Sequence, residues 1–105
     1  MKTVPESALR VACLQIEPRI GEKERNLART LEWIERAAQA DAKLAVLPEL
    51  CNTGYVFETR EEAFGLSEEV PNGPTTEAWM KTAAKRGIFV VAGITEREGE
   101  HLYNA

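Results

Sequence analysis

Glu49 is the residue whose type and position are best suited to acid–base chemistry. It follows a short apolar run, residues 44–47, after an intervening proline, and Gly54 and Tyr55 then turn the chain away. In an open α/β sheet, ligands bind beyond the carboxyl ends of the strands, where Glu49 would lie. A carboxylate there can act as a general base. The structural alternative is a strand-end carboxylate that caps nearby backbone amides.

The two cysteines, Cys13 and Cys51, are the next candidates. Cys51 lies two residues after Glu49, which makes it an apparent nucleophile. Alternate residues share one face only while the chain stays extended, and Pro48 and Gly54 predict a bend. We therefore expect Cys51 to pack at the base of the site, as a substrate-pocket candidate. Cys13 falls within an apolar strand, where we expect a buried, unreactive thiol.

The remaining candidates are weaker. Tyr55 is a second substrate-pocket candidate, and its alternative is packing beneath the acidic segment that follows. His101 is the only histidine and falls in a polar stretch, where we expect it to be solvated. No paired cysteines or histidine-rich spacing indicate a metal, so we expect no metal and no cofactor.

Composition narrows the class of protein. The 105 residues carry 13 basic and 17 acidic side chains, a net charge of −4. The imbalance lies in residues 58–71, which hold five acids and one base and which we interpret as a solvated segment. This acidic segment argues against partners such as nucleic acid or an anionic membrane, because a basic face supplies most of the non-specific affinity for both. The first seven residues lack the apolar core of a signal peptide, so we expect a cytoplasmic protein with free thiols.

Strands and helices alternate along the chain. One helix should run from residues 22–24 to about 40 and bury an apolar stripe, and a second should begin near Pro74 and end at Gly87. We expect strands at 9–16, 44–47, 88–94 and 102–105, with a polar turn at 96–100 and an irregular or partly helical segment at 56–71. The residues expected on the buried faces of the two helices are Leu27, Leu31, Ile34, Ala38, Met80, Ala83 and Ala84. This order predicts an α/β fold in which right-handed crossovers join parallel strands.

The predicted strands are apolar on both faces, and two helices cannot cover both faces of the predicted sheet. Such strands need cover on both faces and partners at their edges. We therefore expect residues 1–105 to be the N-terminal portion of a single larger domain, or to be completed by another chain. Residues 1–8 should form a disordered or extended tail.

Several motifs, in order, resemble the carbon–nitrogen hydrolase (nitrilase) superfamily. The central one is Pro48-Glu49-Leu50 after a short apolar strand, followed by Thr53-Gly54-Tyr55. The others are Val11-Ala12-Cys13-Leu14-Gln15, Asn26-Leu27, Gly73-Pro74-Thr75-Thr76, Val90-Val91-Ala92-Gly93 and Leu102-Tyr103-Asn104-Ala105. The similarity runs from about Leu9 to Ala105.

The resemblance implies a four-layer α-β-β-α sandwich and a Glu-Lys-Cys triad. By position, Glu49 corresponds to the glutamate of that triad, the general base. The lysine and the nucleophilic cysteine of such enzymes would lie beyond Ala105, and neither Lys81 nor Lys85 matches the lysine motif. Members of the superfamily hydrolyse non-peptide C–N bonds without a metal or organic cofactor, and they commonly assemble into homo-oligomers.

Three hypotheses follow. The first is an amidase-type hydrolase that releases ammonia from small amides or N-carbamoyl compounds, of which this piece alone is inactive. The second is a nitrilase acting on nitriles. The third is a non-catalytic α/β module that binds a small molecule at its strand ends.

Overall fold

The computed structural model describes residues 8–105, and the predicted tail lies outside the described residues except for Ala8. Three parallel strands form one sheet in the order β1-β2-β3, with β1 at Val11–Cys13, β2 at Leu44–Val46 and β3 at Phe89–Val91. β2 is therefore the central strand of the three. The strands are shorter than the predicted 9–16, 44–47 and 88–94, but each lies inside its predicted range.

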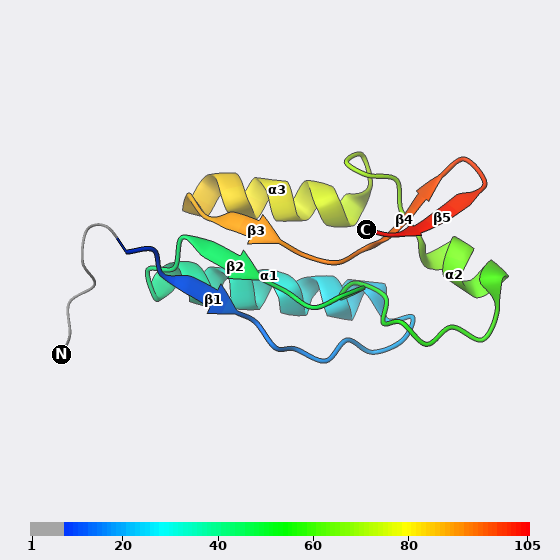
Figure 1. Ribbon diagram of the computed structural model, residues 1–105, viewed down its shortest axis with the longest axis horizontal. Coiled ribbons are helices and arrows are strands. Elements are labelled where there is room, and N and C mark those ends of the chain that lie inside the picture. The colour runs from blue at the N-terminus through cyan, green and yellow to red at the C-terminus, as the bar shows by residue number, and fades with distance from the viewer. Residues whose placement is uncertain (1–7) are drawn as a thin grey trace.

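Two helices connect these strands and pack together on one side of the sheet (Figure 1). α1 spans Lys23–Gln39 and α3 spans Pro74–Arg86, which confirms both predicted helices. α3 begins with proline at its first position, where the missing N–H costs no hydrogen bond. It ends at Gly87, whose φ of 63° lies in the left-handed region that favours glycine at a helix end.

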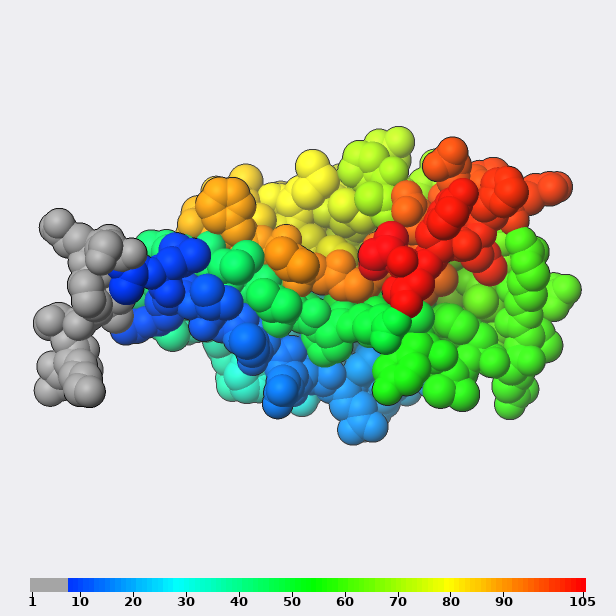
Figure 2. Space-filling model, viewed as in Figure 1, coloured from blue at the N-terminus to red at the C-terminus, as the bar shows by residue number. Residues whose placement is uncertain are grey.

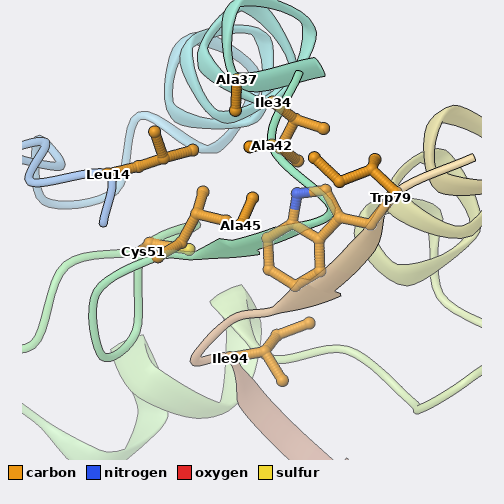
Figure 3. Close-up of a cluster of buried hydrophobic side chains, with 10 residues drawn as sticks. Leu14, Ile34, Ala37, Ala42, Ala45, Cys51, Trp79 and Ile94 are labelled. Atoms are coloured by element: carbon orange, nitrogen blue, oxygen red, sulfur yellow. The ribbon is translucent and has the colours of Figure 1, made fainter. Parts of the chain in front are cut away.

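The core lies between the sheet and these helices. Ala45 of β2, Ile34 of α1 and Trp79 of α3 belong to one buried cluster (Figure 3). Trp79 Nε1 donates to Thr30 Oγ1 over 2.9 Å, so the indole satisfies its polar atom while its rings fill the core. Full burial of a side chain as large as that of Ile34 contributes about 1.5–3 kcal/mol.

The buried faces of both helices differ from the prediction. In α1, polar Asn26 and Thr30 are buried with Ile34 and Ala37, whereas Leu27, Leu31 and Ala38 are only partly buried. In α3, Trp79 is buried and Met80 is 57% exposed. The apolar pattern did not predict these buried polar residues, because the side chains of Asn26, Thr30 and Thr75 have hydrogen-bond partners inside the protein.

The opposite face of the sheet has no cover from the described residues. Figure 2 shows the strands side by side at the surface, in blue, green and orange. Phe89 is 77% exposed and Val91 is 56% exposed. The strand register brings these side chains into line with Val11, Cys13, Leu44 and Val46. Cys13 is exposed on this face, so the prediction of a buried thiol is wrong for the chain as described.

The remaining elements lie beyond the carboxyl ends of the strands (Figure 1). A short helix, α2, spans Arg60–Leu66, as the partly helical prediction for residues 56–71 allowed. An antiparallel hairpin joins β4, Thr95–Glu98, to β5, His101–Asn104. The predicted polar turn at 96–100 is wrong, because Glu96, Arg97 and Glu98 pair across the hairpin and only residues 99 and 100 turn.

Candidate active site at the carboxyl end of the central strand

Glu49 lies just beyond the end of β2, in a segment that residues next to β3 hold in place. Leu47 N donates to Val91 O over 2.8 Å, and Gly93 N donates to Pro48 O over 3.1 Å. Cys51 N then donates to Gly93 O over 3.1 Å. Hydrogen bonds on both sides of Glu49 therefore fix its backbone against the neighbouring strand.

The backbone of this segment turns sharply immediately after Glu49. Leu50 has a φ of 43°, in the left-handed region that is sterically disfavoured for a residue with a side chain. Gly54 N donates to Leu50 O over 2.9 Å and closes the turn. Gly54 itself has a φ of 80°, which confirms that it supplies the positive φ expected of it. Strained backbone of this kind persists where surrounding contacts hold it, and it clusters at functional sites.

Gly93 permits the close approach of the two chain segments. A Cβ atom at Gly93 would lie 2.6 Å from Glu49 Cα and 2.6 Å from Leu50 N. Both are backbone atoms, which cannot rotate away as a flexible side chain could. The position of Glu49 therefore depends on the absence of a side chain at residue 93.

The Glu49 side chain is exposed and has one protein partner. Asn104 Nδ2, at the end of β5, donates a hydrogen bond to Glu49 Oε1. Within residues 8–105 no hydrogen bond or salt bridge involves Oε2. One oxygen is thus held while the other can accept a proton from a bound molecule, which is the geometry that a general base requires.

Asn26, in the first turn of α1, links three segments below the site. Its amide accepts from Arg19 N over 2.9 Å and donates to Arg19 O and Asn52 O over 2.7 and 3.1 Å. Gly21 N also donates to Thr53 O over 3.0 Å. The loop after β1 and the loop after β2 are thereby joined. This explains why a buried asparagine stands where an apolar helix residue would otherwise pack.

A second buried network supports the same loop from the side of α3. Glu68 is 3% exposed and accepts from Thr75 N over 2.8 Å, Thr75 Oγ1 over 2.6 Å and Asn52 Nδ2 over 3.2 Å. Lys23 Nζ forms an ion pair with Oε2 of Glu68 over 2.9 Å, the same oxygen that accepts from Asn52 Nδ2 and Thr75 Oγ1. Burial alone would raise the pKa of Glu68, but the hydrogen bonds from Thr75 and the charge of Lys23 outweigh it and lower that pKa below its ordinary value. Glu68 is therefore a buried anion that joins α1, α3 and the loop after β2.

Cys51 belongs to the loop after β2, and its side chain lies in the core cluster (Figure 3). Its side chain is fully buried, and Sγ donates to Gly93 O over 3.4 Å. Burial raises the pKa of the Cys51 thiol to about 12, although backbone hydrogen bonds offset part of that effect. A thiol of this kind is not ionised near neutral pH, so Cys51 is unsuited to act as a nucleophile.

Tyr55 borders a pocket of about 330 Å³ between the loops after β1 and β2. Pro48 and Gly54 line one side of it, and residues of the loop after β1 line the other. The Tyr55 side chain is 63% exposed, so its role as a pocket residue stays a prediction.

His101 is exposed at the start of β5. No cluster of three or more histidine, cysteine, aspartate or glutamate residues suited to a metal ion occurs within residues 8–105. None of the helices in this part of the chain has the length and apolar character needed to cross a bilayer.

The sequence profile of the carbon-nitrogen hydrolase family matches residues 10–105. This chain belongs to the carbon-nitrogen hydrolase family. A nitrilase from Pyrococcus abyssi is 42% identical over 97 residues, which are 92% of this chain and 37% of that protein. The omega-amidase NIT2 of Danio rerio is 39% identical over 83 residues, which are 78% of this chain and 28% of that protein.

A solved structure extends the comparison to the fold. The crystal structure of an N-terminal amidase superimposes with a TM-score of 0.79 at 24% identity, over 91% of this chain and 24% of that one. The chain therefore has the fold of the N-terminal part of carbon-nitrogen hydrolases, which confirms the predicted fold class. It spans about a third of the length of the curated relatives it matches.

Sequence analysis selected Glu49 as a candidate, but it did not predict the contacts of two residues around it. It assigned Glu68 to a solvated acidic segment, because a run of acids usually marks an exposed face. It named Asn104 only as part of the motif Leu102-Tyr103-Asn104-Ala105 and not as a partner of Glu49. The preceding proline and apolar run identify Glu49 locally, whereas Asn104 meets it only through contact between residues 55 positions apart.

Proposed function

We propose that this chain contributes the general base, Glu49, to an amidase-type carbon–nitrogen hydrolase. The family's triad would be completed by a lysine and a cysteine that follow Ala105 in a longer polypeptide. The substrates we propose are small amides or N-carbamoyl compounds, from which the enzyme releases ammonia. The name of the omega-amidase relative supports amides as the substrate class.

In the proposed reaction Glu49 moves protons for a sulfur nucleophile. Glu49 removes the proton of the cysteine thiol, and the thiolate forms a bond to the amide carbon. The tetrahedral oxyanion is stabilised by the lysine ammonium. When the C–N bond breaks, the protonated carboxyl group gives its proton to the leaving nitrogen, which departs as ammonia. Glu49 then deprotonates a water that attacks the thioester carbon, the C–S bond breaks, and Glu49 returns that proton to the sulfur, so that the carboxylic acid and the cysteine thiol are released.

The observation that carries the proposal is the environment of the Glu49 carboxylate. It stands at the carboxyl end of the central strand, one oxygen receives a neutral amide donor, and no ion pair neutralises it within residues 8–105. An ion pair with lysine or arginine favours the charged form of a carboxylate and opposes its protonation. Among residues 8–105, Glu49 has no such partner.

The test is ammonia release by the longest natural protein that contains this chain, with small primary amides as substrates. We expect Glu49→Gln to lower turnover at least about 100-fold, because general-base catalysis contributes about 10²–10⁴-fold. Glu98→Gln, an exposed glutamate in β4, is the matched control and should keep turnover within about twofold. A Glu49→Gln variant with normal turnover would show that Glu49 is not the base.

Nitriles are a second candidate substrate class, favoured by the name of the Pyrococcus abyssi relative. A thiolate can add to a nitrile carbon as it adds to an amide carbonyl, and the resulting thioimidate needs the same proton carrier. Parallel assays with an amide and the corresponding nitrile distinguish the two classes through their kcat/KM values.

We further propose that residues 1–105 are the N-terminal portion of one hydrolase domain and are inactive alone. Support comes from the uncovered sheet face, where Phe89 and Val91 are more than half exposed. Packing of a second sheet about 10 Å away would bury such a face. Ammonia release by the 105-residue chain at the rate of a longer natural protein would refute this proposal.

A further inference from the structure

We propose that Asn104 is a positioning residue for Glu49: its side-chain amide holds one carboxylate oxygen and leaves the other free for proton transfer. This inference rests on the proposed function and extends it to a second residue. The contact joins Asn104 Nδ2 to Glu49 Oε1 and links the end of β5 to the end of β2.

Backbone hydrogen bonds fix the position of Asn104 relative to Glu49. Asn104 pairs with Thr95 across the hairpin. Beyond it, Ala105 N donates to Ile94 O over 3.0 Å and Ile94 N donates to Ala105 O over 2.9 Å. Ile94 follows Gly93, whose backbone bonds to both sides of Glu49. A continuous set of backbone hydrogen bonds therefore connects the donor residue to the acceptor residue.

The chemistry of the donor suits a base that must change its protonation state. An amide N–H stabilises the carboxylate and fixes its orientation without contributing a positive charge. A lysine or arginine at residue 104 would stabilise the ionised form much more strongly and would compete for both oxygens. With Oε1 occupied by Asn104, Oε2 is the carboxylate oxygen left to accept a proton from a thiol or water.

The orientation matters because general-base catalysis depends on geometry before it depends on basicity. A carboxylate on an exposed side chain with several rotatable bonds would otherwise sample many orientations. The loss of one hydrogen bond to a charged group corresponds to about a 10- to 100-fold change in an equilibrium or rate. We expect that loss in kcat, since the contact orients a reacting group and does not bind substrate.

The test compares Asn104→Ala and Asn104→Asp in the longest natural protein that contains this chain. Asn104→Ala should lower kcat for a small amide about 10- to 100-fold while KM changes less than about threefold. Asn104→Asp keeps the shape but replaces the donor with a second carboxylate, so its loss should equal or exceed that of Asn104→Ala. Asn72→Ala, an exposed asparagine before α3, is the control and should keep wild-type kcat.

A spectroscopic arm separates positioning from a merely structural role. In ¹⁵N spectra, the side-chain amide signals of Asn104 should move in a Glu49→Ala variant while those of Asn72 stay in place. Unchanged Asn104 signals, a kcat within about threefold of wild type in Asn104→Asp, or a change confined to KM would each overturn the inference. A wild-type protein without ammonia release would overturn the proposed function and this inference together, whereas an active wild type with unaffected Asn104 variants would overturn this inference alone.

Discussion

Replacement of the buried Glu68 by glutamine should destabilise the protein strongly and reduce its sensitivity to acid. Three contacts converge on Oε2, from Lys23, Asn52 and the Thr75 hydroxyl, and one on Oε1, from Thr75 N. In Glu68→Gln a carbonyl oxygen can keep the first three contacts. The new NH₂ group then faces the N–H of Thr75, so two donors meet at the start of α3.

The magnitude follows from these contacts. The variant loses the hydrogen bond to Thr75 N and the charge that strengthens the other three contacts, and hydrogen bonds to charged groups contribute about 1.5–3 kcal/mol each. We expect the free energy of unfolding to fall by about 2–3 kcal/mol. At the roughly 2–4 °C per kcal/mol that holds for domains of about 150–250 residues, closer in size to the larger domain proposed above, this corresponds to a decrease in Tm of roughly 4–12 °C.

The pH dependence has a defined sign. The pKa of Glu68 in the folded protein lies below its ordinary value, so its stabilising contribution is present above the pKa of the unfolded chain, about 4.3. That contribution is lost as the pH falls through the lowered pKa of the folded state. Urea unfolding between pH 7 and pH 3 should therefore show a steeper loss of stability in wild type than in Glu68→Gln.

The neighbouring residue provides the matched control. Glu69 is exposed, and Glu69→Gln should change the free energy of unfolding by less than about 0.5 kcal/mol at every pH. If Glu68→Gln changes stability no more than Glu69→Gln, or if both variants keep the acid sensitivity of wild type, then the described network around Glu68 does not stabilise the fold as argued.

Two further predictions concern the residues around Glu49. Gly93→Ala should lower the free energy of unfolding by about 1–3 kcal/mol and turnover about 100-fold, because its Cβ would displace the Glu49 backbone. The control is Gly65→Ala in α2, whose Cβ meets open space and should not destabilise the protein. Equal urea midpoints for the two variants would contradict this prediction. In the folded 105-residue chain, iodoacetamide at pH 8 should modify the exposed Cys13 but not Cys51, which should react only after unfolding. Mass spectrometry measures the modification of each cysteine. Rapid modification of Cys51 without denaturant would show that its thiol is neither buried nor of raised pKa.

Local sequence determined the two long helices and the main candidate residue. The spacing of apolar residues predicts α1, while Pro74 and Gly87 set the ends of α3 through backbone preferences that need no distant partner. A short apolar run followed by Pro48 and Glu49 likewise predicts a buried strand that ends in a carboxylate. These features depend on neighbours within a few residues, so the sequence alone is sufficient to predict them.

Only the tertiary structure decided how the residues around Glu49 are arranged. Glu68 is a buried anion because Lys23 and Thr75 reach it from two different helices, and no local pattern encodes that meeting. Cys13 is exposed because no described residue covers its face of the sheet. Asn104 contacts Glu49 because strand pairing brings residues 55 positions apart together. Contacts of this kind depend on register and packing between distant segments, which residue types and short spacings do not specify.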